Sequence, residues 1–212
     1  MITVKRSVET VFFITLITAV TLFVMVQTKS TARLPVFSAP IPETVSPFPT
    51  DVPPGEIKRS FMESPQGGTH LTLESQRVND GILYSVYVSS RSGELGNKIY
   101  QGKETKANTL TIPFNAWSTD MDYVFLESRF SSITDYLIFQ ASGAIFSDGS
   151  PYLSVQQLFK AKVPNYSIED VTGWAGSTSL IVNTKAVEGE QRVSFWFEVP
   201  SQSFIQLGTY FK

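Results

Sequence analysis

The sequence predicts an all-β domain of antiparallel strands, preceded by a single transmembrane helix and a proline-rich linker. Three features indicate this: an apolar run at residues 7–28, a cluster of prolines after it, and short β-branched and aromatic segments separated by turn-forming residues from residue 57 onward. The expected organisation is a short cytoplasmic head at 1–6, the helix at 7–28, the linker at 29–56 and the β domain at 57–212.

The apolar run contains one charged residue, Glu9, and is flanked by Lys5 and Arg6 before it and Lys29 after it. About 20 apolar residues in a helix cross the roughly 30 Å hydrocarbon core of a bilayer, and a helix satisfies the backbone of a single segment there. The run is longer than the roughly 7–15-residue core of a cleaved signal peptide, and no A-x-A-like site follows it. We therefore expect an uncleaved signal-anchor that contacts the lipid bilayer through residues 7–28, with a cleaved secretory signal as the alternative.

The orientation of this helix is expected to place the C-terminal domain outside the cytoplasm. The short head carries Lys5 and Arg6, and cationic flanks tend to stay on the cytoplasmic side, although Lys29 and Arg33 follow the helix. The chain has no cysteine, so it forms no disulfide and no thiolate metal site. For an extracytoplasmic domain, this favours a bacterial or archaeal cell membrane over an animal secreted protein.

The linker contains seven prolines between Leu34 and Glu56. Proline removes a backbone donor and shifts the preceding residue to extended geometry, so we expect a semi-rigid polyproline-like spacer. At about 3.1 Å per residue the spacer would reach roughly 60–70 Å and hold the following domain away from the membrane. A leader without a spacing role is the alternative, and both interpretations place the domain boundary near Glu56.

The remaining residues are sufficient for one domain with a substantial core. Short β-branched and aromatic runs predict strands, and no window has helical spacing. The expected strands are Thr69–Leu73, Ile82–Val88, Thr109–Phe114, Asp122–Leu126, Asp135–Phe139, Ser179–Val182 and Arg192–Val199. Turns are expected at Asn79-Asp80-Gly81, Ser92-Gly93, Ser142-Gly143, Asp148-Gly149 and Glu188-Gly189, whose residues allow positive φ or tight turns.

The strand segments group into three similar units, near residues 57–104, 109–162 and 166–210. In the second unit a strand leads to Trp117-Ser118, an acidic turn and an apolar strand. The third unit repeats this order around Trp174, and the first is less regular. Each unit is expected to close on an apolar pair followed by polar or basic residues, and these pairs are Ile99-Tyr100, Leu158-Phe159, and Ile205 with Leu207.

These units resemble TolB-like and WD40-like β-propeller repeats, whose blades commonly carry a Trp-Ser pair, an acidic turn and a strand of the kind Tyr123–Leu126. The resemblance covers residues 69–207 and rests on Trp117-Ser118 and Trp174, but Thr119-Asp120-Met121 replaces the usual Pro-Asp-Gly turn. It implies four-stranded blades that stack through apolar strands. Three blades are fewer than the about four to eight that close a ring, so we expect propeller-like blades in an open or incomplete array, with a β-sandwich as the alternative.

Sequence motifs for catalysis or metal binding are missing. His70 is the only histidine, and no partner at motif spacing would place it in a Ser-His-Asp triad or a zinc site. Asp120 and Asp122 are interpreted as a solvated turn, and Asp148 as a turn without the spaced ligands of a calcium loop. The other carboxylates considered, Glu127, Asp135, Glu169 and Asp170, are scattered over turns and strand ends. We therefore assign no catalytic, cofactor-binding or metal-binding residue and expect no cofactor.

The densest aromatic cluster is Phe195-Trp196-Phe197. Neighbouring residues of a strand point to opposite faces, so Phe195 and Phe197 share one face and Trp196 lies on the other. We interpret the cluster as an internal strand with both faces covered, rather than as a ligand site at Trp196.

The charge of the chain disfavours nucleic acid as a partner, because the formal net charge is −2 and the β domain has no basic cluster. The predicted function is a membrane-tethered, extracytoplasmic interaction or sensing module that is not an enzyme. Its expected partner is a protein, or a second copy of the chain, bound through open sheet edges. The alternative is a propeller-type accessory fragment of a hydrolase system, of the peptidase or glycosidase kind.

Overall fold

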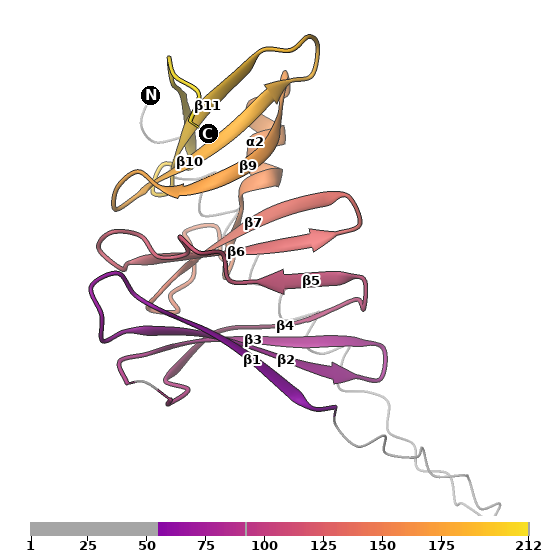
Figure 1. Ribbon diagram of the computed structural model, residues 1–212, viewed down its shortest axis with the longest axis vertical. Coiled ribbons are helices and arrows are strands. Elements are labelled where there is room, and N and C mark those ends of the chain that lie inside the picture. The colour runs from indigo at the N-terminus through magenta and orange to yellow at the C-terminus, as the bar shows by residue number, and fades with distance from the viewer. Residues whose placement is uncertain (1–54, 92, 212) are drawn as a thin grey trace, which may run out of the picture. The chain divides into compact units, whose positions relative to one another are not determined.

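Figure 1 shows the computed structural model, which describes residues 55–91 and 93–211. These residues belong to one compact unit, Asp51–Lys212. The predicted head, the membrane helix and all but the last two residues of the linker lie outside the described residues. Within the described part of the chain, no helix has both the length and the apolar character that a membrane crossing requires.

The described residues form three four-stranded antiparallel sheets, which we name A, B and C. Sheet A contains β1 (Ile57–Glu63), β2 (His70–Val78), β3 (Gly81–Ser89) and β4 (Asn97–Glu104). Sheet B contains β5 (Asn108–Thr111), β6 (Tyr123–Phe130), β7 (Ile133–Gln140) and β8 (Leu153–Ser154), and sheet C contains β9 (Tyr166–Trp174), β10 (Ser179–Ala186), β11 (Arg192–Glu198) and β12 (Ser203–Gln206). Because hydrogen-bonded neighbours are also neighbours in sequence, each sheet is a meander of consecutive hairpins.

The predominantly antiparallel β fold is confirmed, and each of the seven expected strands overlaps a strand of the structure. Alternation of strands from the Trp117 and Trp174 units within two facing sheets would overturn the repeat interpretation. The described residues instead form three sheets of consecutive strands, without such alternation. Glycines of four expected turns adopt positive φ, namely Gly93, Gly143, Gly149 and Gly189.

The expectation that no segment is helical is wrong, because α2 spans Val155–Lys162. The side chain of Ser154 caps this helix by accepting from the backbone N–H of Gln157. Val155 and Phe159, four residues apart on one helical face, are buried. Leu158-Phe159 therefore does not close the second unit as a strand pair, and Phe159 instead anchors a helix against the core.

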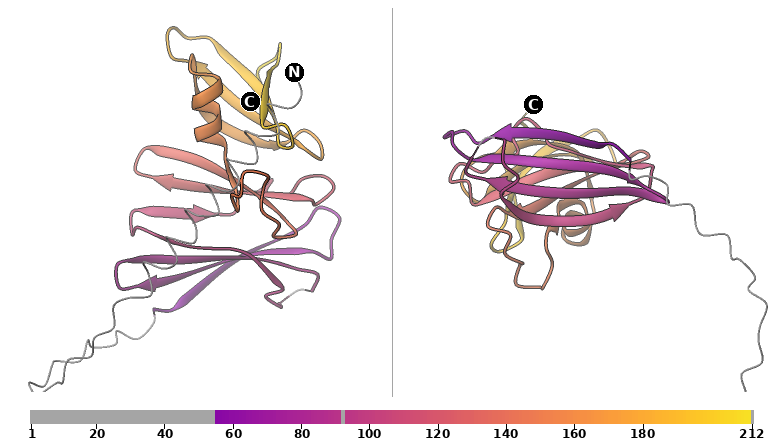
Figure 2. Two further views of the ribbon diagram at one scale, coloured as in Figure 1. Left: turned by 180° about the vertical axis from the view of Figure 1, so that it is seen from behind. Right: turned by 90° about the horizontal axis from the view of Figure 1, so that it is seen from below.

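Sheet B buries both of its faces because its side chains alternate. Val124 and Leu126 pack towards sheet A, in a core with Leu71 and Val86. Phe125, between them in sequence, packs in a second core with residues of α2 and sheet C. Figures 1 and 2 show the resulting order, in which sheet B lies between sheet A and sheet C.

The outward faces of the two outer sheets differ from the buried faces. On β2 and β3, the side that faces sheet B carries Leu71, Leu73, Tyr84 and Val86, whereas the opposite side carries Thr72, Glu74, Ser85 and Tyr87. The outward side of β2 and β3 is therefore largely polar, whereas β1 places the exposed Phe61 on the same face.

On sheet C, the segment that follows β12 covers part of the outward face. The backbone N–H groups of Leu207 and Phe211 donate to the carbonyl and the hydroxyl of Ser194, over 2.8 and 2.9 Å. The Ser194 hydroxyl in turn donates to Asn183, and both residues are fully buried. The polar centre of this face is thus hydrogen-bonded within the chain rather than left open.

A buried tyrosine between sheets B and C makes the stability sensitive to high pH. Burial raises the pKa of Tyr136 to about 12, and the residue is 5% exposed. Between pH 10 and 12, Tyr136 therefore keeps its proton in the folded state, whereas the same tyrosine in the unfolded chain, with a pKa near 10, loses it. The unfolding free energy should be unaffected by Tyr136 below pH 10 and should fall by up to about 1.4 kcal/mol per pH unit between pH 10 and 12. Tyr100, whose pKa is also raised to about 12 by burial, adds to this loss. Urea titrations at pH 9, 10 and 11 should therefore show a falling stability, and Tyr136→Phe should reduce the slope; an unchanged slope in the variant would contradict the assignment.

Candidate functional site

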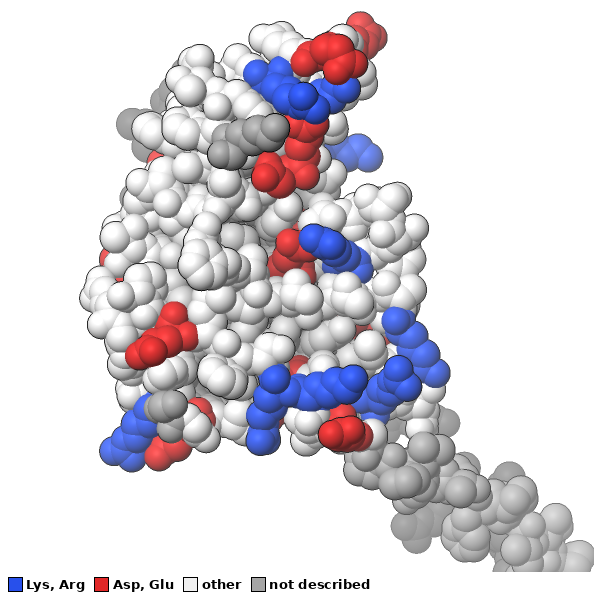
Figure 3. Space-filling view, in the orientation of Figure 1, with Lys and Arg blue, Asp and Glu red and all other residues white. Residues whose placement is uncertain are grey.

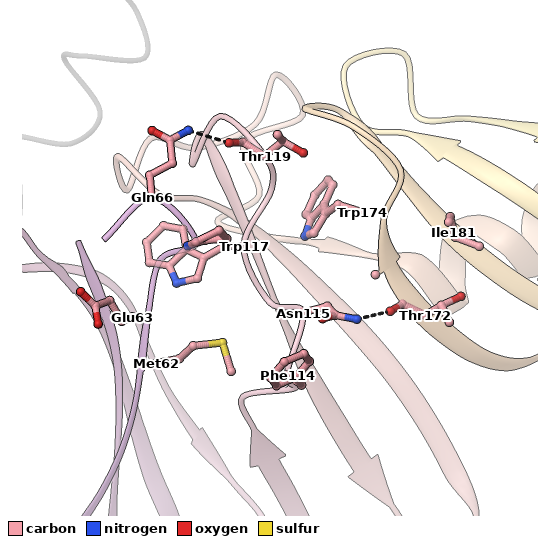
Figure 4. A pocket seen from close by; sticks show the side chains of 12 residues that line it. Met62, Glu63, Gln66, Phe114, Asn115, Trp117, Thr119, Thr172, Trp174 and Ile181 are labelled. Carbon is pink, nitrogen blue, oxygen red and sulfur yellow. Dashed lines mark hydrogen bonds between the residues drawn. The ribbon is translucent and has the colours of Figure 1, made fainter. Parts of the chain in front are cut away.

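A cleft of about 680 Å³ is lined by residues from all three sheets and their loops (Figure 4). The first strand of sheets A and C lies at the cleft, and sheet B contributes the connection between β5 and β6. The lining residues are Met62, Glu63, Pro65, Gln66, Phe114, Asn115, Trp117, Thr119, Thr172, Gly173, Trp174 and Ile181. Glu63 is the only charged residue among them, so the cleft is largely apolar with uncharged polar groups at its wall.

The wall between sheets B and C is fixed by two hydrogen bonds that cross between the sheets. The indole Nε1 of Trp174 donates to the carbonyl of Ala116 over 3.1 Å. The side-chain amide of Asn115 donates to the carbonyl of Thr172 over 2.6 Å. The Trp174 ring also stacks on Tyr123, with ring centroids 6.1 Å apart. These contacts hold Trp174 in place before any ligand binds.

Gly173 allows the close approach on which this wall depends. Its φ is +134°, a region that L side chains rarely adopt. A Cβ at this position would lie 2.7 Å from the Cβ of Asn115. A larger residue would therefore push Asn115 away from sheet C.

The opposite wall is tied to sheet B by Gln66, whose side-chain amide donates to the carbonyl of Thr119 over 2.9 Å. Two aromatic residues between β5 and β6 then contrast in exposure. Phe114 is 90% exposed, an unusual environment for a large apolar side chain. Trp117 is only 4% exposed, and its Nε1 has no hydrogen-bond acceptor among the described residues. A buried donor left without a partner costs about 1–3 kcal/mol.

The predicted turn at Asp120 and Asp122 lies beside the cleft and is built by local hydrogen bonds. Asp120 accepts from the Ser118 hydroxyl over 2.8 Å and from the backbone N–H of Asp122 over 3.2 Å. Partial burial raises the pKa of Asp120, but these hydrogen bonds outweigh it and the net pKa is lowered. Asp120 therefore stays ionised and acts as a turn acceptor, while Met121 takes the positive φ of 67°.

The other candidate residues lie apart from the cleft. His70 begins β2 and lies opposite Glu63 and Ser89 in the sheet A register, next to a smaller depression. Asp148 accepts from the backbone N–H of Ser150 in a turn. Across residues 55–91 and 93–211, no three His, Cys, Asp or Glu side chains are placed to hold a metal ion.

Three of the four scattered carboxylates have structural partners, namely Asp135, Glu169 and Glu127. Asp135 accepts from the Ser154 hydroxyl over 2.6 Å and from the backbone N–H of Gln156 over 3.0 Å, so it positions the start of α2. Glu169 is paired with Arg192, which lowers the pKa of the carboxyl. Glu127 pairs with Arg129 in sheet B. Asp170 lies in sheet C, opposite Asn183 in the register of β9 and β10.

Trp196 differs from the expectation for an internal strand. Phe195 and Phe197 are buried on one face, as the alternation predicts, but Trp196 is 38% exposed. Sheet C has no further sheet on that side among the described residues, so Trp196 lies in register between Ile181 and Ile205 on the outward face. The error came from assuming that every strand lies between two sheets.

The surface around these elements is mixed in charge. On the face shown in Figure 3, Lys and Arg are interspersed with Asp and Glu, and broad areas between them are uncharged. Such a surface does not select a strongly charged partner by long-range attraction. Comparison of the chain with known protein families, with characterised proteins and with solved structures gave no match.

Proposed function

We propose that the chain is a membrane-tethered, extracytoplasmic binding module without catalytic activity, and that the cleft between its sheets is the binding site. The tether and its orientation rest on the apolar segment at 7–28 and its flanking charges. The proposed partner is a protein.

The three sheets are interpreted as propeller-like blades in an open array. Each is a four-stranded antiparallel meander, and sheet B packs one face on the preceding sheet and one on the following sheet. This is the arrangement expected of blades. The polar outward side of β2 and β3 and the covered face of sheet C explain how three units can persist without closing a ring.

The observation that carries the binding proposal is the 90% exposure of Phe114 at the mouth of an already formed cleft. Ligand sites are typically largely preformed, apolar and furnished with a few fixed polar groups. The cleft has these properties through Trp174, Asn115 and Gln66, whose hydrogen bonds fix its walls. Aromatic residues in such settings dominate the energy of protein interfaces.

The ligand that suits the cleft is a protein segment with apolar side chains and an uncharged backbone. Apolar groups would contact Phe114 and Trp174, the aromatic lining residues that are not fully buried. Met62 also lines the cleft, and its flexible thioether can move to admit a ligand. Such a movement would give the buried Nε1 of Trp117 access to a ligand carbonyl and satisfy it.

Site-specific photocrosslinking in living cells tests the proposal. A photoreactive phenylalanine at position 114 of the full chain should give a discrete protein adduct, because this side chain lies at the mouth of the cleft. The matched control is the same probe at Ile133, which is 57% exposed and does not line the cleft. We expect the yield from position 114 to be several-fold higher; equal yields, or adducts with lipid alone, would contradict the proposal.

A further inference from the structure

Strand β1 differs from the other edge strands of the three sheets. It pairs with β2 through seven consecutive residues without a register shift, and six of the seven are exposed. Of the other edges, β5 and β12 have four residues, β8 has two, and β4 and β9 are interrupted by bulges. The view from below in Figure 2 shows β1 at one edge of sheet A, where no other strand of the described residues pairs with it.

An exposed, regular edge presents a row of unpaired backbone N–H and C=O groups, which is a template for another strand. Short or bulged edges are common protections against such pairing, and the other edges of the described sheets have them. The apolar side chains of β1 add to its exposure, since Phe61 is 78% and Ile57 is 47% exposed. Proline, another common protection, is absent from the strand.

The outward face of β1 has a self-complementary pattern. Met62 pairs with the buried Leu71, so its neighbours Phe61 and Glu63, together with Arg59, lie on the face directed away from sheet B. Along this face of the strand, a cation (Arg59), an aromatic ring (Phe61) and a carboxylate (Glu63) follow one another in that order. In an antiparallel pair with a two-fold axis through Phe61, each Arg59 lies opposite Glu63 of the second copy, and the two Phe61 rings lie opposite each other.

We propose that β1 pairs antiparallel with β1 of a second copy, in this register, and joins the two A sheets into one continuous sheet. Each charge pair is supplied twice by the symmetry. Arg59 already contacts Glu74 through Nε at 2.6 Å, and its guanidinium carries further N–H donors for a second carboxylate. The proposal goes beyond the binding function and does not depend on what the cleft binds.

The absence of native cysteine makes a direct test possible. Directly opposed residues of antiparallel strands have Cα atoms about 4.5–5.5 Å apart, which is within disulfide range. Full-length chain carrying Phe61→Cys, in membranes and under mild oxidation, should form a covalent dimer. The control Ile133→Cys replaces another exposed apolar residue. A dimer yield for Phe61→Cys no higher than for this control overturns the proposal.

Charge reversal tests the register. Arg59→Glu should raise the dissociation constant of the detergent-solubilised dimer by about tenfold or more, since two attractive pairs become repulsive. Adding Glu63→Arg should restore affinity, because the pairs are then inverted. Both variants lose the Arg59–Glu74 ion pair, and the double variant also loses the hydrogen bond that the Gly68 N–H donates to Glu63 over 3.2 Å. Affinity that is restored despite this further loss therefore reports the contact between copies. Equal dissociation constants for the single and double variants refute this register, and a wild-type chain that sediments as a monomer refutes the dimer itself, whatever the photocrosslinking at position 114 shows.

Discussion

Replacing Gly173 with alanine is expected to lower the unfolding free energy by about 2–6 kcal/mol. Two costs add: a non-glycine residue at φ +134° is strained by about 1–3 kcal/mol, and a Cβ 2.7 Å from the Cβ of Asn115 overpacks the wall by about 1–3 kcal/mol. Displacing Asn115 also breaks its hydrogen bond to Thr172. Urea unfolding of the purified chain measures the loss.

The matched control is Gly176→Ala, in the turn that follows the same strand. A Cβ there meets nothing within 4 Å, and Gly176 does not have a positive φ. Its unfolding free energy should stay within about 0.5 kcal/mol of the wild-type value. If the two variants were equally stable, the close approach of sheet C to Asn115 would be wrong, and with it the preformed wall of the cleft.

Replacing Phe159 with alanine is expected to cost about 3–5 kcal/mol, the usual range for removing a buried phenylalanine. Phe159 is 2% exposed and meets Phe195 and Phe204 edge to face, with ring centroids 5.4 and 5.0 Å apart. The substitution would remove the main contact by which α2 is held to sheet C. Chemical unfolding followed by fluorescence and by circular dichroism should show one shifted transition.

Lys160→Ala is the control for this substitution, because its side chain is exposed in the same helix. It should change stability by no more than about 0.5 kcal/mol. A similarly small effect of Phe159→Ala would mean that α2 is not part of the core. Two separate transitions in the Phe159 variant would contradict the single cooperative unit that the continuous packing implies.

The strands could be predicted because their signal is local. Leu180, Val182, Phe195 and Phe197 alternate with Ile181 and Trp196, which are less buried, and this alternation of side chains predicts one apolar face. The helix α2 could not be predicted in this way, since eight residues are too few for a convincing period. Its start depends on Ser154 and on Asp135, which is distant in sequence and is brought near only by the pairing of β7 with β8.

Glycine shows a second limit of sequence interpretation. Gly81 was expected to permit a tight turn or a positive φ, but it begins β3 with an ordinary φ. A Cβ there would lie 2.2 Å from the carbonyl oxygen of Glu104 on β4. The reason for glycine is thus a contact across the sheet rather than the turn, and a close approach between distant segments leaves no local pattern.

The cleft itself was not predicted, because it forms only when the three sheets stack. Trp117 and Trp174 were singled out as repeat markers, and the structure brings both to the cleft. Phe114 was expected at the end of a strand, yet it lies after β5 ends at Thr111 and is exposed. Its run of Ile112, Pro113 and Phe114 contained a local signal, since proline lacks the backbone donor that a longer strand pairing would use.

The central claim is a tethered binding module outside the cytoplasm, and cysteine labelling of intact cells tests it most directly. Ile145 is 64% exposed in the β domain, and Thr3 lies in the predicted cytoplasmic head. A membrane-impermeant maleimide that reaches the outer face of the cell membrane should label Ile145→Cys equally in intact cells and in lysed cells. It should label Thr3→Cys only after lysis. The reverse pattern, with Ile145→Cys protected until lysis, would contradict the account.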